Sequence, residues 1–210
     1  MGGAVSIQPS MDITPIVQDV KEFPKLGIKL SYLQTLIKNL PEDERIDSTT
    51  EDICEKFIKP ITLPFKCTYC EFLQCIDPSV IGQSTVFISH AWKSRFFDVV
   101  DALLHYFSDE PEIIIWLDLF SSNHHQTPDR SFDWWENTFK TGISEIGRTV
   151  MLLAPWGDFL PLTRTWCLWE LYCTIATGCD FDIAISTKSE ARFIAEMEED
   201  ATTVLRTLLE

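Results

Sequence analysis

Short apolar runs alternate with segments of helical periodicity from Thr85 onward, and this rhythm constrains the fold more than any other feature of the chain. Strands that are apolar almost without a break are typical of a parallel sheet covered by helices on both faces. Short βα units with such strands predict a doubly wound α/β fold. We expect strands over 85–89, 112–118, 149–154 and 181–186, and helices over 94–108, 132–146, 164–177 and 188–209.

The residues before this repeating part have a different pattern, and we divide the chain into 1–80 and 81–210. Prolines and weak periodicity mark residues 1–24 as a leader, and the rest of the first part predicts a small helical extension that packs on the α/β domain. The chain stops within a helical pattern. We therefore expect the α/β domain to be truncated at its C-terminus, as the head of a longer protein.

Helical spacing and capping signals predict three helices in the extension. Apolar residues recur with helical spacing over 27–40, and this helix should end before Pro41. A capping box at 48–51 should begin a second helix, which should end before Pro60 because proline breaks helical hydrogen bonding. The remaining segments are a polar loop over 41–47 and a short helix over 65–76.

Charge and cysteine content exclude several classes of function. The chain has 17 Lys and Arg against 32 Asp and Glu, a net charge of −15, which repels phosphate backbones and argues against nucleic acid as a partner. Seven cysteines without a secretory signal indicate reduced thiols in the cytoplasm. Cys67 and Cys70 form a single pair, and zinc requires four ligands, so we expect no metal.

The first six residues match the pattern for N-myristoylation, with Gly2 exposed after removal of Met1 and Ser6 at the required offset. The alternative is that so short a pattern occurs by chance. A single acyl chain anchors a protein only marginally. If Gly2 is acylated, we expect weak association with membranes.

Polar and aromatic side chains follow the predicted strands at the points where they end. Ser89, His90 and Trp92 come after the first strand, and Asp118 ends the second. Because the carboxyl ends of parallel strands share one edge of a sheet, these residues should lie together at a ligand site. Glu170 in the helix over 164–177 should reach the same edge.

Trp166 and Glu170 are four residues apart and should share a face of their helix. We expect Leu168, Leu171 and Ile175 on another face to be buried against the sheet. The alternative for Glu170 is a surface position, paired with Arg164 or Arg148.

Two of these segments resemble a known family. The strand and polar residues from Thr85 to Trp92 resemble the first box of the TIR (Toll/interleukin-1 receptor) domain. The segment Trp166-Cys-Leu-x-Glu-Leu171 is similar to the pattern that opens the third helix of plant-type TIR domains. The resemblance covers 85–186, and Ser-His-Ala-Trp is typical of divergent TIR-like modules at the head of larger multidomain proteins. It implies a flavodoxin-like parallel sheet and a role in intracellular signalling.

The resemblance also implies an activity, because several TIR domains hydrolyse NAD⁺ at the nicotinamide–ribose bond with a glutamate at the position of Glu170. Nicotinamide leaves as a neutral molecule, so one carboxylate can suffice where ordinary glycosidases need two. NAD⁺ would be the substrate, and no separate cofactor is expected. The resemblance and the positions at the sheet edge suggest base stacking for Trp92 and Trp135, ribose binding for His90 and Asp118, and a lining role for Ser89 and Trp166.

The alternative function is non-catalytic. In that case the chain is an interaction module that assembles with itself or with other signalling domains through the loop over 120–131 and neighbouring helices. The family's usual Arg-Asp…Pro-Gly loop is absent, and 123–130 stands in its place. The family's fifth strand is also missing from the chain or lies beyond residue 210.

Overall fold

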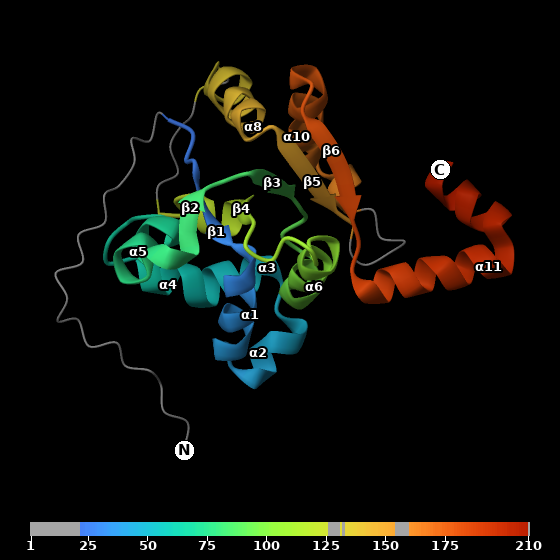
Figure 1. Ribbon diagram of the computed structural model, residues 1–210, viewed down its shortest axis with the longest axis horizontal. Coiled ribbons are helices and arrows are strands. Elements are labelled where there is room, and N and C mark those ends of the chain that lie inside the picture. Colours follow the sequence, from blue (N-terminus) through green and yellow to red (C-terminus); the bar gives the residue numbers. More distant parts are fainter. Residues whose placement is uncertain (1–21, 126–130, 132, 154–159, 210) are drawn as a thin grey trace.

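The computed structural model describes residues 22–125, 131, 133–153 and 160–209. Its centre is a six-stranded sheet in the order β2-β1-β4-β3-β5-β6, with helices on both sides (Figure 1). The expected α/β class is confirmed, and the sheet is mixed, with most of its strands parallel.

The parallel part of the sheet has a doubly wound order. It consists of β3 (Val86–Ser89), β4 (Ile114–Leu117), β5 (Arg148–Leu152) and β6 (Asp180–Ala184). β3 lies between β4 and β5, so the chain leaves β3 to one side and later returns to its other side. This order is compatible with a flavodoxin-like fold, in which ligands bind where the direction of winding changes.

The helices expected between the strands are present. They are α6 (Phe96–Tyr106), α8 (Lys140–Ile146) preceded by a π-helical turn η3 (Trp134–Phe139), and α10 (Thr165–Thr177). The helix expected after the last strand is α11 (Thr187–Leu209), which is kinked at Asp200. Gly178 ends α10 with φ of 71°, a left-handed conformation that glycine adopts without steric cost. Two short helices, α7 (Asp118–Ser121) and α9 (Leu160–Thr163), were not predicted.

Alternation along the strands gives the sheet two different faces. Val86 and Ile88 belong to a large aliphatic core with α1 and α6, whereas Phe87 on the same strand packs with Trp116 in an aromatic cluster beneath α8 and α10. Successive side chains of a strand point to opposite faces. Ser89 lies two residues after Phe87, and Asp118 lies two residues after Trp116. Their side chains therefore point toward the face of the sheet that carries the aromatic cluster.

The structure corrects the expectation of a purely helical extension. Residues Leu26–Lys29 form β1, which pairs antiparallel with β4. Just after the expected boundary, Ile81–Gln83 form β2, an unpredicted strand that pairs antiparallel with β1. The helix expected over 27–40 therefore begins later, as α1 (Leu30–Asn39). Helical spacing alone predicted a start at residue 27. The backbone of β1 instead pairs with the edge of β4, whose N–H and C=O groups would otherwise lack partners.

Other boundaries in this part also differ. The segment expected to be a loop forms α2 (Glu42–Asp47), and the capping box lies one residue later than expected, between Thr49 and Asp52. The following helix continues past Pro60 through α3 (Thr50–Ile53), the π-helical η1 (Cys54–Ile58) and α4 (Lys59–Thr62). Pro60 is tolerated because it lies at the start of the turn that follows the π-helix, where its missing N–H breaks no α-helical bond.

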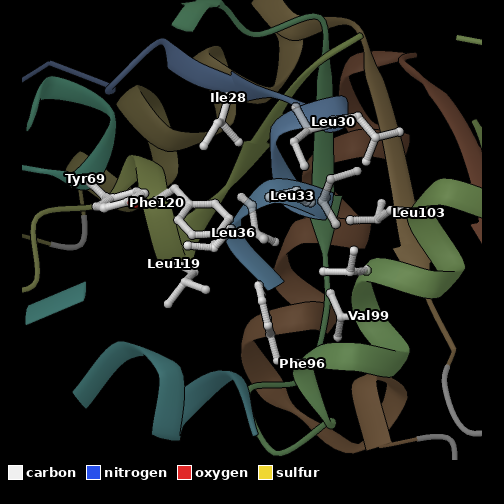
Figure 2. Packing of buried hydrophobic residues seen from close by; sticks show 14 of the residues in the cluster. Ile28, Leu30, Leu33, Leu36, Tyr69, Phe96, Val99, Leu103, Leu119 and Phe120 are labelled. Atoms are coloured by element: carbon white, nitrogen blue, oxygen red, sulfur yellow. The ribbon is translucent and has the colours of Figure 1, made fainter. Parts of the chain in front are cut away.

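The elements before residue 85 belong to the same core as the sheet. Leu30, Leu33 and Leu36 of α1 pack between the strands and α6, and Tyr69 of α5 (Tyr69–Ile76) contacts Phe120 (Figure 2). Each fully buried leucine contributes roughly 1.5–3 kcal/mol. The α/β domain thus depends on these elements for one side of its core.

At the other end of the chain α11 extends away from the sheet (Figure 1). It is attached at its start, where Asp101 of α6 accepts from the Thr187 N–H and His105 contacts Glu190. Among the described residues, no helix is both long and apolar enough to span a membrane.

We predict that Gly27→Ala destabilises the fold by roughly 1–3 kcal/mol, because its Cβ would overlap the backbone of β4. An added Cβ would lie 2.3 Å from the Ile115 carbonyl oxygen and 2.4 Å from Ser84 Oγ. Gly82 faces Gly27 across β1 and β2, but the atoms nearest to a Cβ there belong to the Ile114 side chain, at 3.4 Å. Urea unfolding should show a loss for Gly27→Ala and little change for Gly82→Ala; equal losses would contradict the predicted overlap.

Candidate functional site

Glu170 is buried on the face of α10 that contacts the sheet, with 3% of its surface exposed. Cys167, Cys173 and Thr174 share this face. The expectation that Leu168 and Ile175 are buried was wrong, because they are 45% and 68% exposed. Apolar residues occur all around α10, so hydrophobicity alone did not identify which face meets the sheet.

The Glu170 carboxyl group forms a hydrogen bond with the last residue of the central strand β3. Ser89 Oγ donates to Glu170 Oε2 at 2.5 Å. Behind it, Thr174 Oγ1 donates to the Glu170 carbonyl at 2.8 Å and lies 2.9 Å from the Thr149 hydroxyl on β5. The alternative of a surface ion pair with Arg148 is excluded, since Arg148 lies near Glu110 and Asp182 and Glu170 is buried.

This pair lies at the topological switch point of the sheet. Ser89 is the last residue of β3 and pairs in register with Met151 of β5. β3 and β5 are the two neighbouring strands from which the chain winds in opposite directions. Open α/β sheets bind ligands in the crevice outside the carboxyl ends of such strands.

Burial changes the acid–base behaviour of this carboxyl. The pKa of Glu170 is raised from 4.5 to about 8, and loss of solvation is the largest cause. The nearby Asp118 charge acts in the same direction, while the Ser89 hydrogen bond and Arg164 oppose the shift. Glu170 is therefore mostly protonated at pH 7. Burial also raises the pKa of the neighbouring Cys167 thiol to about 11, so this cysteine is not an activated nucleophile.

A second polar group follows β3 and β4. Trp92 Nε1 donates to Asp118 Oδ2, and the Leu119 N–H donates to Asp118 Oδ1 at 2.8 Å. His90 Nδ1 lies 3.7 Å from the same carboxylate oxygen. Burial lowers the pKa of His90, so its imidazole is neutral at pH 7. Three of the predicted site residues, His90, Trp92 and Asp118, are thus brought together.

The N-terminal elements hold the loop that carries these residues. Thr50 Oγ1 lies 3.2 Å from His90 Nε2, and the N–H groups of Thr50 and Glu51 donate to the carbonyls of Ser94 and Trp92. The start of α3 thereby fixes the turn after β3. Sequence patterns gave no signal for this contact, because it joins segments about forty residues apart.

An aromatic cavity of about 210 Å³ opens beside this group. Trp92, Asp118 and Trp166 of the predicted site line it, whereas Ser89, His90 and Glu170 do not. The Trp135 side chain and Gly2 lie outside the described residues. The other lining residues, which sequence reasoning missed as site residues, are Phe23, Pro24, Trp116, Ser122, His124, Trp134 and Phe139.

Local structure explains how distant aromatic residues meet here. The π-helical η3 has i→i+5 geometry, which places Trp134 and Phe139 on one face, with ring centroids 6.3 Å apart. Phe139 also contacts Trp166, at 5.4 Å, and Phe23 stacks on Trp116, at 5.2 Å. The sequence signal for such a wall is its 7 Trp and 14 Phe, many of them near the ends of the predicted strands.

Neither a metal-binding cluster among the described residues nor a similar known protein identifies the function of this site. Within the described ranges, no group of three His, Cys, Asp or Glu side chains is arranged to hold a metal ion. Comparisons with protein-family models, curated proteins and solved structures found no match. The site must therefore be interpreted from its own chemistry.

We predict that Glu170 makes the fold less stable as pH rises. The pKa is higher in the folded state, so the stabilisation is complete below pH 4.5 and is lost as pH rises through about 8. At ~1.4 kcal/mol per pKa unit, the loss is on the order of 4 kcal/mol. Urea unfolding at pH 5.5 and pH 8.5 should show a smaller loss for Glu170→Gln than for the wild type. Identical pH dependence would contradict a buried, protonated Glu170.

Proposed function

We propose that the chain is a TIR-like signalling domain that hydrolyses NAD⁺ at the nicotinamide–ribose bond, with Glu170 as the catalytic residue. The observation that carries this proposal is a single buried carboxyl, held by Ser89 at the switch point of the sheet and adjacent to an aromatic cavity. The resemblance of 85–92 and 166–171 to TIR sequences supports the same assignment.

The reaction suits a site with one carboxylate. The bond between ribose C1′ and the pyridinium nitrogen breaks, and its electron pair neutralises the ring, so nicotinamide leaves without a general acid. A water oxygen bonds to C1′ and releases a proton, which the Glu170 carboxylate accepts. The ionised carboxylate also stabilises the positive charge that develops on the sugar.

Protonation of Glu170 then controls the rate. With a pKa of about 8, only about one tenth of the free enzyme carries the carboxylate at pH 7. The cationic nicotinamide ring of the substrate favours the charged form, because an opposite charge lowers the pKa of a carboxyl group. The proposal therefore includes activation of Glu170 by the substrate itself.

Access to Glu170 requires a rearrangement. The Glu170 carboxyl is hydrogen-bonded to Ser89 and does not line the cavity. Trp166, one turn earlier on α10, does line it. Pockets for drug-sized ligands usually hold roughly 300–1,000 Å³, so a cavity of about 210 Å³ suits one ring of the dinucleotide. Movement of the Trp166 side chain would join the cavity to Glu170.

We predict that the purified chain releases nicotinamide from NAD⁺, measured by chromatography at high protein concentration with and without a crowding agent. Glu170→Gln keeps the shape of the side chain but cannot ionise, and should lower kcat at least ~100-fold. Glu198→Gln, an exposed change on α11, should leave the rate unchanged. Absence of release from the wild type would remove the enzymatic proposal.

Ser89→Ala supplies a sharper test of the same prediction. The Ser89 hydroxyl lowers the pKa of Glu170, so its removal should move the midpoint of the kcat/KM–pH profile upward from about 8. A variant that merely destabilised the fold would lower the rate at every pH. An unshifted profile would show that Ser89 does not tune the catalytic carboxyl.

We also propose that the protein is located in the cytoplasm. All seven cysteines are free in the structure, in agreement with a reducing cytoplasm. Acylation of Gly2 would add weak membrane association. Mass spectrometry of the protein isolated from its own cells would detect the myristoyl group.

A second candidate function is self-assembly without catalysis, and the outer face of α10 favours it. Leu168, Tyr172 and Ile175 are exposed there, and the only charged residue of α10, Glu170, is buried. Lys140 Nζ lies 5.5 Å from the centre of the Tyr172 ring. In a chain of net charge −15, an apolar face without an exposed carboxylate on its helix is where a second copy meets the least repulsion. We therefore assign a second copy of the chain as its partner.

We predict that Leu168→Ser combined with Ile175→Ser converts a dimer or larger assembly to a monomer, because both residues lie on that face. Light scattering coupled to size-exclusion chromatography measures the mass directly. Ile194→Ser changes an equally exposed residue on α11 and serves as the control. A wild-type monomer at high concentration, or an unchanged assembly in the double variant, would exclude this surface.

A further inference from the structure

The aromatic cavity has an electrostatic character that the hydrolytic proposal does not use. Its walls include six phenylalanine and tryptophan rings, contributed by segments far apart in the chain. Among the lining residues that the structure describes, Asp118 is the only carboxylate and none is Lys or Arg. The electron-rich faces of aromatic rings attract cations, most strongly for tryptophan.

The negative charge of Asp118 is held in place and is not cancelled. The Trp92 indole and the Leu119 N–H donate to its two oxygens. His90 Nδ1 lies 3.7 Å from Asp118 Oδ1, and burial keeps that imidazole neutral. Within the described part of the chain, no Lys or Arg lies at ion-pair distance from Asp118.

The chemistry of the walls also selects the kind of cation. A lysine-type ammonium is compact and strongly hydrated, and loses its water only against several acceptors. The described walls offer aromatic faces, the Ser122 hydroxyl, and a His124 imidazole whose Nε2 lies 2.9 Å from the Leu119 carbonyl oxygen. Their one carboxylate already accepts hydrogen bonds at both oxygens. Cations whose charge is spread over a ring or over N-methyl groups need no acceptors and are bound by aromatic cages.

We propose that this cavity is a binding site for an organic cation with diffuse charge, held between the tryptophan rings and Asp118. Two sources share that chemistry, the pyridinium ring of an oxidised nicotinamide nucleotide and a quaternary ammonium headgroup. A volume of about 210 Å³ accepts either group and excludes a whole dinucleotide. The inference rests on the proposed function only in assigning the pyridinium source; the cavity binds its cation without hydrolysis.

The test is isothermal titration calorimetry of the full chain with two pairs of probes that differ in charge and little in shape. The first pair is 1-methylnicotinamide and nicotinamide, and the second is choline and 3,3-dimethylbutan-1-ol. At least one cation should bind ~10-fold or more tightly than its neutral counterpart. The pair with the larger ratio identifies the source. No binding of either cation, or equal affinity for cation and neutral probe in both pairs, overturns the proposal.

Variants locate the binding in this cavity. Asp118→Asn and Trp166→Leu should each weaken cation binding ~10-fold. Trp169→Leu is the matched control, because Trp169 lies on the same helix and does not line the cavity. Thermal unfolding of each variant identifies any that fail to fold. If a variant does not fold, the ratio of wild-type affinities for the cationic and the neutral probe still decides the proposal. Unchanged affinity in folded Asp118→Asn and Trp166→Leu would place the binding elsewhere.

Glu170→Gln separates this inference from the hydrolytic one. It should abolish nicotinamide release and retain cation binding, because Glu170 does not line the cavity. Cation binding without any hydrolysis by the wild type would remove the enzymatic proposal alone. Hydrolysis without discrimination between charged and neutral probes would remove the cation site alone.

Discussion

The two-residue alternation of the central strand β3 is the constraint on which the rest of the structure depends. Val86 and Ile88 point into the aliphatic core, and Phe87 and Ser89 follow the opposite face. β3 pairs with β4 on one side and β5 on the other, so this alternation propagates through the sheet. One face supplies stability, and the other ends in the polar and aromatic residues of the candidate site. A shift of register by one residue would exchange the two faces.

Burial of the Glu170 carboxyl lowers the stability of the fold and raises the pKa of a group at the candidate site. Removing Glu170 from water costs free energy, which appears as its raised pKa, and the Ser89 hydroxyl compensates only part of that cost. Perturbed pKa values of this kind concentrate at functional sites. The short helix α3 and the turn after β3 keep the neighbouring His90, Trp92 and Asp118 in place. The stability of the N-terminal segments is thereby coupled to the geometry of the site.

Local signals predicted much of this fold. Apolar strands separated by helical segments were sufficient for the doubly wound order, and Gly178 marked the end of α10 correctly. β1 and β2 were missed because each is very short and is formed by pairing with a distant edge of the sheet. The aliphatic periodicity of α1 extended into β1 and concealed the boundary. The buried face of α10 was misjudged because its outer face is equally apolar.

The amino-acid sequence alone was enough to bring Ser89, Asp118 and Glu170 to one edge, because polar residues at the ends of parallel strands and in the following helix converge there. Three features depended on long-range packing. These are the burial of Glu170 against Ser89, the clamp from Thr50 on His90, and the aromatic cavity. Each joins segments separated by tens of residues, and no local propensity encodes which side chains meet across such a distance. Strand order and alternation decided where the groups lie, and packing decided their solvation, their protonation and the shape of the space beside them.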